Sequence, residues 1–177
     1  MKYKLKEIGE MISGGTPSTK HTEYYSEDGI GWITPKDLSN YSKKYICHGA
    51  RYISQTGLDN SSAKLMPPNS VLVSSRAPIG YVAMSGDYLA TNQGFKSIIP
   101  DKSKVLPEYR YYLMSNSKYK LEQMASGSTF KEVSGKTMAN FEVDIPDLGK
   151  QKRIISIMNP IVQKMESNSQ INDNLVA

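Results

Sequence analysis

A change of pattern near Pro100 limits the folds that this chain can adopt. Between Gly31 and Pro100, apolar residues come in short runs separated by turn residues, a spacing typical of strands. These runs are "GWIT", "KYIC", "RYIS", "SVLVSS", "YVAM" and "GFKSIIP". Beyond Pro100 the runs lengthen and take the residue types of helices. We therefore expect a mixed, sheet-rich α+β domain with helices, whose strands form a meander with some longer loops.

Helices are expected after Pro100. In "LPEYRYYLMSN", Pro107 stands where a first helical turn tolerates proline, which predicts a helix over about 107–116. Ser117 can cap a second helix, and Gly127 stands where that helix would end in a left-handed residue. A polar loop, "SGSTFKEVSGKT", then leads to a last strand. Its alternating apolar residues are Phe141, Val143 and Ile145.

The tail from Asp147 onward is predicted to be helical, with Asp147 as N-cap. Asn159 and Pro160 repeat the pattern of a cap and a first helical residue, so a further segment is expected to begin there. An apolar stripe at spacings of four, three and four is formed by Ile154, Met158, Ile161 and Met165. Either this stripe packs on its own domain or it joins a partner helix, with Asn168, Asn172 and Leu175 continuing the seam. The expected division is 1–146 and 147–177.

Charge and composition restrict the function classes. The formal net charge of +5 permits a polyanionic partner such as nucleic acid, although the positive charge is spread along the chain. No apolar run approaches the roughly 20 residues that span a bilayer, and the start lacks the apolar segment of a signal peptide. We expect a cytoplasmic protein. The lone Cys47 cannot form an intramolecular disulfide.

Recognisable catalytic motifs are missing from the sequence. Gly135-Lys136-Thr137 supplies half of a nucleotide phosphate loop, but Phe130 occupies the position of its first glycine. A structural zinc site needs four Cys or His ligands, and the chain has one Cys and two His. Cys47 and His48 are neighbours in an expected strand, where their side chains would point to opposite faces. We expect neither catalysis nor a bound metal.

Two polar loops carry the residue types that contact DNA backbones. In "SGGTPSTK", residues 13 to 20, the glycines allow close approach of the backbone to another surface, while hydroxyls and Lys20 can bind phosphates. The loop around Ser126 to Lys131 repeats this mixture, with Lys136 shortly after it. A plain hairpin turn and a solvated loop are the alternatives for the two segments.

Four stretches together resemble landmarks of the specificity subunits of Type I restriction-modification enzymes. In chain order they are "LKEIGEMISGGTPSTK", "GIGWITPKDLS", "ATNQGFKSIIP" and "SGSTFKEVSGKTMANFEVDIPDLGKQKRI". The resemblance implies a target recognition domain over 1–146, followed over 147–177 by a long spacer helix that forms a coiled coil. It also implies a subunit without an active site, which reads double-stranded DNA and recruits other subunits. Those partners are methylation subunits that bind S-adenosylmethionine and a restriction subunit that uses ATP with magnesium.

The residues that would contact DNA fall into three sets. Candidate cations are Lys20, Lys36, Arg76, Lys96, Lys131 and Lys136. Candidate amides and hydroxyls are Thr16, Ser18, Thr34, Asn92, Gln93, Ser128 and Thr129. Thr34, Asn92 and Gln93 lie in the family-like stretches, so a framework role is equally open for them. Base readers are expected between the stretches, around Tyr41 to Lys64, and are Arg51, Gln55 and Asn60.

One departure from the family concerns the number of units. Such subunits usually contain two recognition domains and two spacer helices, and this chain has one of each. A homodimer joined through antiparallel helices, along Ile154, Met158, Ile161 and Met165, would restore the arrangement and make the half-sites identical and inverted. Two alternatives stay open. They are the recognition domain of a fused restriction-methylation polypeptide and, more remotely, a small nucleotide-phosphate enzyme that uses "SGKT".

Overall fold

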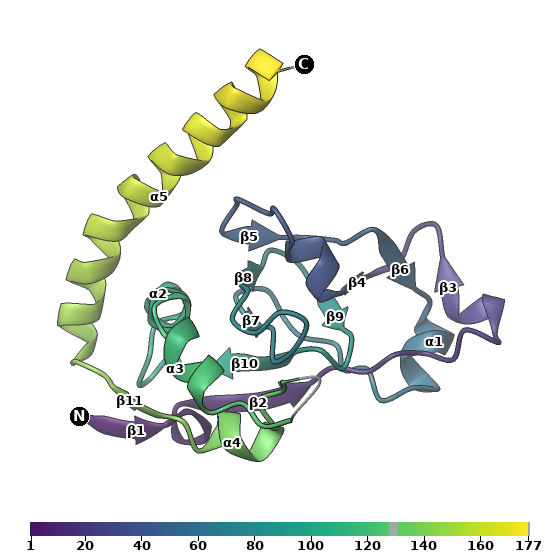
Figure 1. The fold of residues 1–177 in the computed structure, drawn as a ribbon, viewed down its shortest axis with the longest axis horizontal. Coiled ribbons are helices and arrows are strands. Elements are labelled where there is room, and N and C mark those ends of the chain that lie inside the picture. Colours follow the sequence, from purple (N-terminus) through teal and green to yellow (C-terminus); the bar gives the residue numbers. More distant parts are fainter. Residues whose placement is uncertain (128–130, 177) are drawn as a thin grey trace.

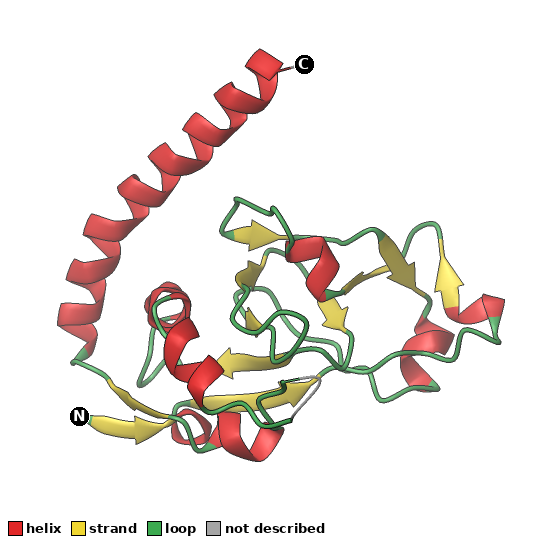
Figure 2. Cartoon of the chain, viewed as in Figure 1, coloured by secondary structure: helices red, strands yellow, loops and turns green. Residues whose placement is uncertain are grey.

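Strands of three sheets form the body of the molecule. The computed structural model describes residues 1–127 and 131–176, and within them the largest sheet has five strands (Figures 1 and 2). Their order is β2 (Gly9–Ser13), β10 (Lys96–Pro100), β7 (Val71–Val73), β8 (Val82–Ser85) and β5 (Tyr45–Ile46). The second sheet has the order β3 (Tyr25–Ser26), β6 (Arg51–Ile53), β4 (Ile30–Ile33) and β9 (Leu89–Thr91). The third pairs β1 (Lys2–Lys4) with β11 (Glu142–Asp144).

The order of the strands contradicts the predicted meander. β4 pairs in parallel with β9, and β5 pairs in parallel with β8, although each pair is far apart in the sequence. Parallel neighbours require crossover connections, which a meander lacks. Each of the six predicted runs nevertheless contains a strand. The predicted bend at residues 77–80 joins β7 to β8, which are antiparallel.

Short helices cover the end of the body nearest to β1 and β11 (Figure 2). They are α2 (Pro107–Ser115), α3 (Lys118–Gln123) and α4 (Gly135–Ala139), while α1 (Gln55–Asp59) follows β6. The helix starting at Pro107 is confirmed. Ser117 precedes α3, but its hydroxyl donates to the Leu113 carbonyl instead of capping. Gly127 has a φ of 115°, yet α3 ends at Gln123, so the predicted glycine end is wrong.

The core beneath these helices contains a buried arginine. Phe141, Val143 and Ile145 are all buried there, as their alternation predicted. The Arg110 side chain is fully buried in α2, and its Nη2 donates to the Ile8 carbonyl at 2.6 Å. Its Nε and Nη1 have no partner among the described residues. Burial lowers the pKa of Arg110 to about 9.

The long helix α5 (Leu148–Val176) leaves the body beside β1 and β11 and extends away as an arm (Figure 1). Asp147 caps it, because its Oδ1 accepts from the Lys150 amide at 2.9 Å, and this bond lowers the pKa of Asp147. The predicted break at Asn159 is wrong, since α5 continues through Pro160. Among the described residues, no helix has the length and apolar character needed to span a membrane.

Candidate nucleic-acid interface

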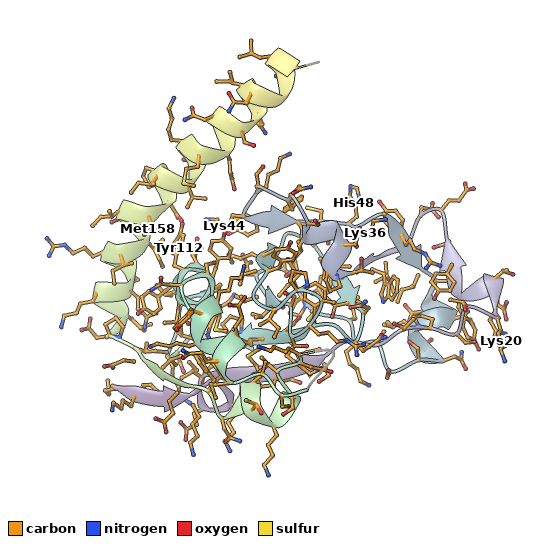
Figure 3. All side chains as sticks on the ribbon, in the orientation of Figure 1. Lys20, Lys36, Lys44, His48, Tyr112 and Met158 are labelled. Carbon is orange, nitrogen blue, oxygen red and sulfur yellow. The ribbon has the colours of Figure 1, made fainter. Side chains whose placement is uncertain are left out.

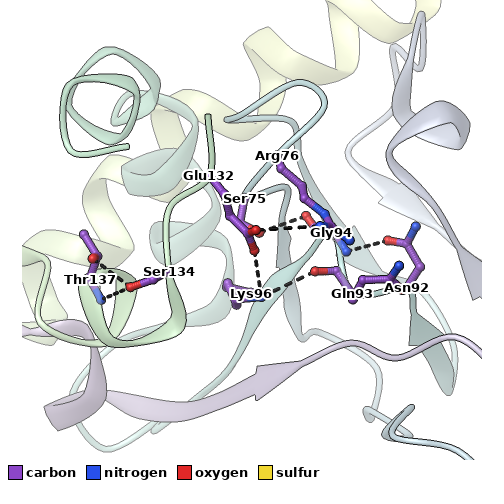
Figure 4. A network of polar contacts seen from close by, with 9 residues as sticks. All are labelled: Ser75, Arg76, Asn92, Gln93, Gly94, Lys96, Glu132, Ser134 and Thr137. Atoms are coloured by element: carbon purple, nitrogen blue, oxygen red, sulfur yellow. Dashed lines mark hydrogen bonds and ion pairs between the residues drawn. The ribbon is translucent and has the colours of Figure 1, made fainter. Parts of the chain in front are cut away.

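The centre of the candidate site is the turn Asn92-Gln93-Gly94, which connects β9 to β10 and is called the 92–94 turn below. The Asn92 amide donates to the Ile33 carbonyl at 2.9 Å, and the Asn92 side chain accepts from the Gly94 amide. The Gly94 carbonyl accepts from the backbone amide of Ser75 at 2.7 Å. These bonds tie the turn to the end of β4 and to the segment that follows β7; Figure 4 shows the bonds of Gly94 with Ser75 and Asn92. Gln93 is exposed at its tip.

The glycines of the opening loop bring that loop against the same turn. A Cβ on Gly14 would lie 1.9 Å from the Asn92 carbonyl oxygen, so only glycine fits there. The Gly15 amide donates to the Thr91 carbonyl at 2.9 Å. The close approach that these glycines were expected to allow is therefore made to the chain's own backbone. Thr16 is exposed, and its hydroxyl donates to the side-chain oxygen of Gln93.

Two candidate cations share one carboxylate beside the turn. Glu132 Oε1 lies 3.6 Å from Lys96 Nζ, and Glu132 Oε2 lies 3.7 Å from Arg76 Nη1 (Figure 4). The Val133 amide donates to the Ser75 carbonyl, so the segment that carries Glu132 is tied to this edge. Lys131 and Lys136 flank the contact in sequence and are exposed.

The loop after β4 completes the surroundings of the turn. A Cβ on Gly94 would lie 2.9 Å from the Pro35 ring, and Lys36 beside it is exposed. The Thr34 amide and hydroxyl both donate to Asp37 Oδ2, at 2.7 and 2.6 Å. This engagement supports the framework role for Thr34. The central cluster is defined as Thr16, Thr34, Lys36, Arg76, Asn92, Gln93, Lys96, Lys131 and Lys136.

The remaining described candidates lie on a separate part of the body, called the outer lobe, around β3, β6 and α1. Figure 3 shows Lys20 at the end of the molecule distant from α5. The Arg51 guanidinium lies 4.1 Å from the centre of the Tyr25 ring. Gln55 donates to Asp59, and the side chain of Asn60 donates to the Thr56 carbonyl. The outer lobe thus carries Ser18, Lys20, Arg51, Gln55 and Asn60, all of them exposed.

Some predicted features fall outside these two groups. Ser128 and Thr129 lie outside the described residues. β5 ends at Ile46, so Cys47 and His48 follow a strand instead of belonging to it, and both are exposed. Within residues 1–127 and 131–176, no three His, Cys, Asp or Glu side chains gather in a way that could hold a metal ion.

The "SGKT" segment forms a capped helix start. The Ser134 hydroxyl accepts from the Thr137 amide at 3.1 Å and lies 2.9 Å from the Thr137 hydroxyl. A phosphate loop would offer such an amide to its ligand. Here the amide is already bonded within α4, which gives no support to the nucleotide reading.

Glu132 and Ser75 are parts of the site that sequence reasoning missed. Both are held by contacts between segments far apart in the chain, and side-chain types alone carry no such information. Glu132 did have one signal, because it is the one acid in the sequence "SGSTFKEVSGKT" and stands between Lys131 and Lys136. An acid in that setting indicates an internal counter-charge.

The predicted stripe on α5 is mostly exposed. Ile154, Ile161 and Met165 have exposed fractions of 37%, 49% and 65%, whereas Met158 is half-buried at the edge of the stripe. Ile157, which the sequence reading omitted, is 58% exposed. The face that turns toward the body is instead formed by buried and half-buried residues, which are Gln151, Ile155, Asn159, Val162 and Glu166. α5 therefore has a body face and a separate apolar face.

Comparison with known proteins gives a match along the whole chain. The family described as "Type I restriction modification DNA specificity domain" matches residues 1–177. The MjaIX specificity subunit of Methanocaldococcus jannaschii, a Type I restriction enzyme subunit, is 42% identical over 175 residues, which are 97% of this chain and 40% of that protein. The EcoR124I/EcoR124II specificity subunit of Escherichia coli is 27% identical over 161 residues, 88% of this chain and 39% of that one. The chain thus spans about 40% of these relatives.

Solved structures share the fold. The HsdS subunit of Thermoanaerobacter tengcongensis superposes with a TM-score of 0.70 at 22% identity, over 97% of this chain and 39% of that one. A chain from a study of the assembly and conformational transition of the type I R-M system gives a TM-score of 0.76 at 20% identity. That match covers 99% of this chain and 41% of the other. The arrangement of a mixed α+β body and a long C-terminal helix is therefore that of these structures.

Proposed function

The chain belongs to the family of Type I restriction-modification DNA specificity domains, and from this membership we propose that it reads one half of a two-part sequence in double-stranded DNA. It would do so without catalysing a reaction itself. In this proposal residues 1–146 are the target recognition domain and residues 147–177 are the spacer helix. The protein would be located in the cytoplasm, because the DNA that it reads would be there.

The observation that carries the proposal is the gathering of cations at the 92–94 turn. Lys36, Arg76 and Lys96 come from separate parts of the sequence, and the turn places them beside exposed Gln93 and Thr16. Several cations interleaved with amides and hydroxyls suit a polymer of phosphates better than a single small anion. The central cluster would therefore grip phosphates. The outer lobe would read base edges in the major groove, where all four base pairs can be distinguished.

Partners would supply the chemistry. Methylation subunits would bind S-adenosylmethionine, and a restriction subunit would use ATP with magnesium, so this chain would hold neither cofactor. A second copy, joined along the apolar face of α5, would present a second recognition domain. Twofold symmetry would then make the two half-sites identical and inverted.

The test is DNA binding with two classes of variant. The target would first be mapped from methylated positions in a cell that carries the complete system. Fluorescence anisotropy would then compare duplexes with intact and scrambled targets, using the chain with its methylation subunits. Lys36→Ala and Lys96→Ala should each weaken binding to both duplexes by the same factor. Each should also reduce the slope of log affinity against log salt concentration by about one. Arg51→Ala or Gln55→Ala should cost about 1–3 kcal/mol on the intact target only.

Lys2→Ala is the matched control for the phosphate variants, because Lys2 is exposed on β1, which is not part of the central cluster. It should leave both affinities unchanged. Equal affinity of the wild-type complex for the intact and scrambled duplexes would contradict the proposal.

A further inference from the structure

α5 is fixed at its base by a buried glutamine. Gln151 is fully buried, and its Nε2 donates to the carbonyls of Lys104 and Pro146, both at 2.9 Å. Its Oε1 accepts from the Leu106 amide at 2.8 Å. The three hydrogen bonds use both polar atoms of the side-chain amide, Oε1 and Nε2. Because Gln151 is buried, water does not compete for these bonds. The first turns of the helix are therefore held firmly against the segment that precedes α2.

A second contact joins the middle of α5 to the body. Lys44 Nζ donates to Asn159 Oδ1 at 2.9 Å, and the Tyr112 hydroxyl donates to the same oxygen at 2.6 Å. The backbone amide of Lys44 donates to Glu166 Oε1 at 2.5 Å. The Lys44 ammonium also lies 5.8 Å from the centre of the Tyr112 ring. Lys44, Tyr112, Asn159 and Glu166 together are called the mid-helix clamp.

Figure 3 shows Lys44 and Tyr112 on the side of the body that faces α5. Two separated anchors fix the direction of a rod, whereas one anchor leaves it free to tilt. Asn159 and Glu166 follow Gln151 by about 12 and 22 Å along the axis, at a rise of 1.5 Å per residue. Pro160 lies within the clamp, between Asn159 and Glu166, and has no amide hydrogen, so the helix is weakened at this point. The direction of the outer half therefore depends on the clamp and on one exposed contact beyond it, in which the Ser169 hydroxyl donates to the Ser42 hydroxyl at 3.2 Å.

We infer that Lys44 is a positioning residue that sets the angle between α5 and the body, and through it the number of base pairs between the two half-sites. The part about DNA rests on the proposed function. Lys44 lies between the second and third family-like stretches, in the region where base readers are expected. The same region of the chain would then determine both which bases are read and how far apart the half-sites lie.

The angle can be measured without DNA. Spin labels on Lys120→Cys in α3 and Gln170→Cys in α5, both exposed positions, report the distance from the body to the outer helix. Cys47→Ser removes the native thiol, and dilution with unlabelled chain removes distances between copies. Lys44→Met, which keeps most of the side-chain length, and Asn159→Ala should both shift and broaden the distance distribution. Thermal unfolding would establish that each variant is folded.

Lys43→Met is the matched control, because Lys43 is exposed and makes no hydrogen bond or ion pair with α5 among the described residues. It should reproduce the wild-type distribution. An unchanged distribution in folded Lys44→Met and Asn159→Ala, or an equal change in Lys43→Met, would overturn the positioning role.

A second arm tests the consequence for DNA. Duplexes that carry the mapped half-sites at the natural spacing, or with one base pair more or fewer, would be compared in the complete complex. Lys44→Met should reduce the preference for the natural spacing by about tenfold, as expected for the loss of one charge-assisted hydrogen bond, with base preference unchanged. An unchanged spacing preference would overturn the link to DNA. Absence of wild-type binding to any duplex would instead refute the proposed function, while the distance measurement would still decide the role of Lys44.

Discussion

Glu132 is the residue whose charge bears most directly on the proposed phosphate contacts. Its carboxylate is shared by Lys96 and Arg76, so in the proposed interface it would cancel part of the positive charge that these residues offer to phosphates. Glu132→Gln should tighten binding to every duplex, target or not, by up to about fivefold, since partly exposed ion pairs contribute up to about 1 kcal/mol. Anisotropy titrations at two salt concentrations would measure this gain.

The control for this prediction is Glu142→Gln, an exposed acid on β11 that is not part of the central cluster. Its affinities should match those of the wild type. Weaker binding by Glu132→Gln would mean that the carboxylate is needed to hold the two cations in place.

Arg110 is predicted to lower the stability of the fold. Its buried charge has one hydrogen bond, to the Ile8 carbonyl, and that carbonyl also accepts from the Asp101 amide at 3.1 Å. Arg110→Met would therefore remove a buried charge without leaving the carbonyl unpaired. The free energy of unfolding should rise by about 1–2 kcal/mol in denaturant titrations.

The pH dependence of this gain follows from the direction of the pKa shift. Because the folded-state pKa of Arg110 is lowered to about 9, the charge is present in both states below that pH. The gain should therefore be constant between about pH 5 and 8. The exposed Arg153→Met should change stability little. A loss of stability in Arg110→Met would show that a buried partner, such as water, accepts the remaining hydrogen bonds of the guanidinium.

Sequence reasoning named residue types for the candidate site but could not give their arrangement. Lys36, Arg76 and Lys96 were identified as cations, and the structure brings them to one turn. Their grouping depends on Gly14 and Gly94, whose missing side chains permit contacts with other loops. Such contacts arise from strand order, which the spacing of apolar residues does not determine. For the same reason, the contacts of Glu132 with Lys96 and Arg76 were not predicted.

At the scale of elements, alternation and turn residues predicted seven strands, and four others within the described residues were missed. Two of these, β1 and β2, contain charged residues and lack a long apolar run. Their place in the sheets comes from pairing with β11 and β10. The false break at Asn159 has a related cause. An Asn-Pro pair matches a helix start, but the body binds the Asn159 side chain and α5 continues.

Pro160 gives a prediction for the helix itself. Pro160→Ala would supply the missing amide hydrogen and replace proline, which is unfavourable in helix interiors. The substitution should stabilise the helix by up to about 3 kcal/mol. Far-UV circular dichroism should report a higher unfolding temperature, and hydrogen exchange around residue 160 should slow. Lower stability in Pro160→Ala would indicate that the clamp requires the backbone shape that proline imposes.

Tyr112 links α2 to α5 through a phenol that stays protonated to high pH. Burial, with smaller contributions from Tyr111 and nearby acids, raises its pKa from 10.0 to about 12. A raised folded-state pKa stabilises the fold below the unfolded value, and this contribution is lost as pH rises through about 10 to 12. The stability difference between wild type and Tyr112→Phe should therefore shrink over that range in urea titrations. A constant difference would contradict the role of burial.

At the scale of the whole molecule, the apolar face of α5 predicts self-association. A charge at its centre, Ile161→Glu, should weaken the dimer by tenfold or more, since a buried unpaired carboxylate costs several kcal/mol. Sedimentation equilibrium over a range of concentrations would measure this. Ser156→Glu is the control, because Ser156 is exposed and is not part of the apolar stripe. A wild-type chain that stays monomeric at high concentration would contradict the predicted dimer.

The pairing of β1 with β11 has a consequence for how two such units can be connected. β11 leads directly into α5, and β1 pairs with β11. β1 therefore lies at the base of α5, called the foot of the arm (Figure 1). If two arms run in opposite directions, the tip of each reaches the foot of the other, beside β1 of that copy. A connection from one arm to β1 of the other unit would then be short and would leave the geometry intact. Relatives more than twice the length of this chain fit such a connection.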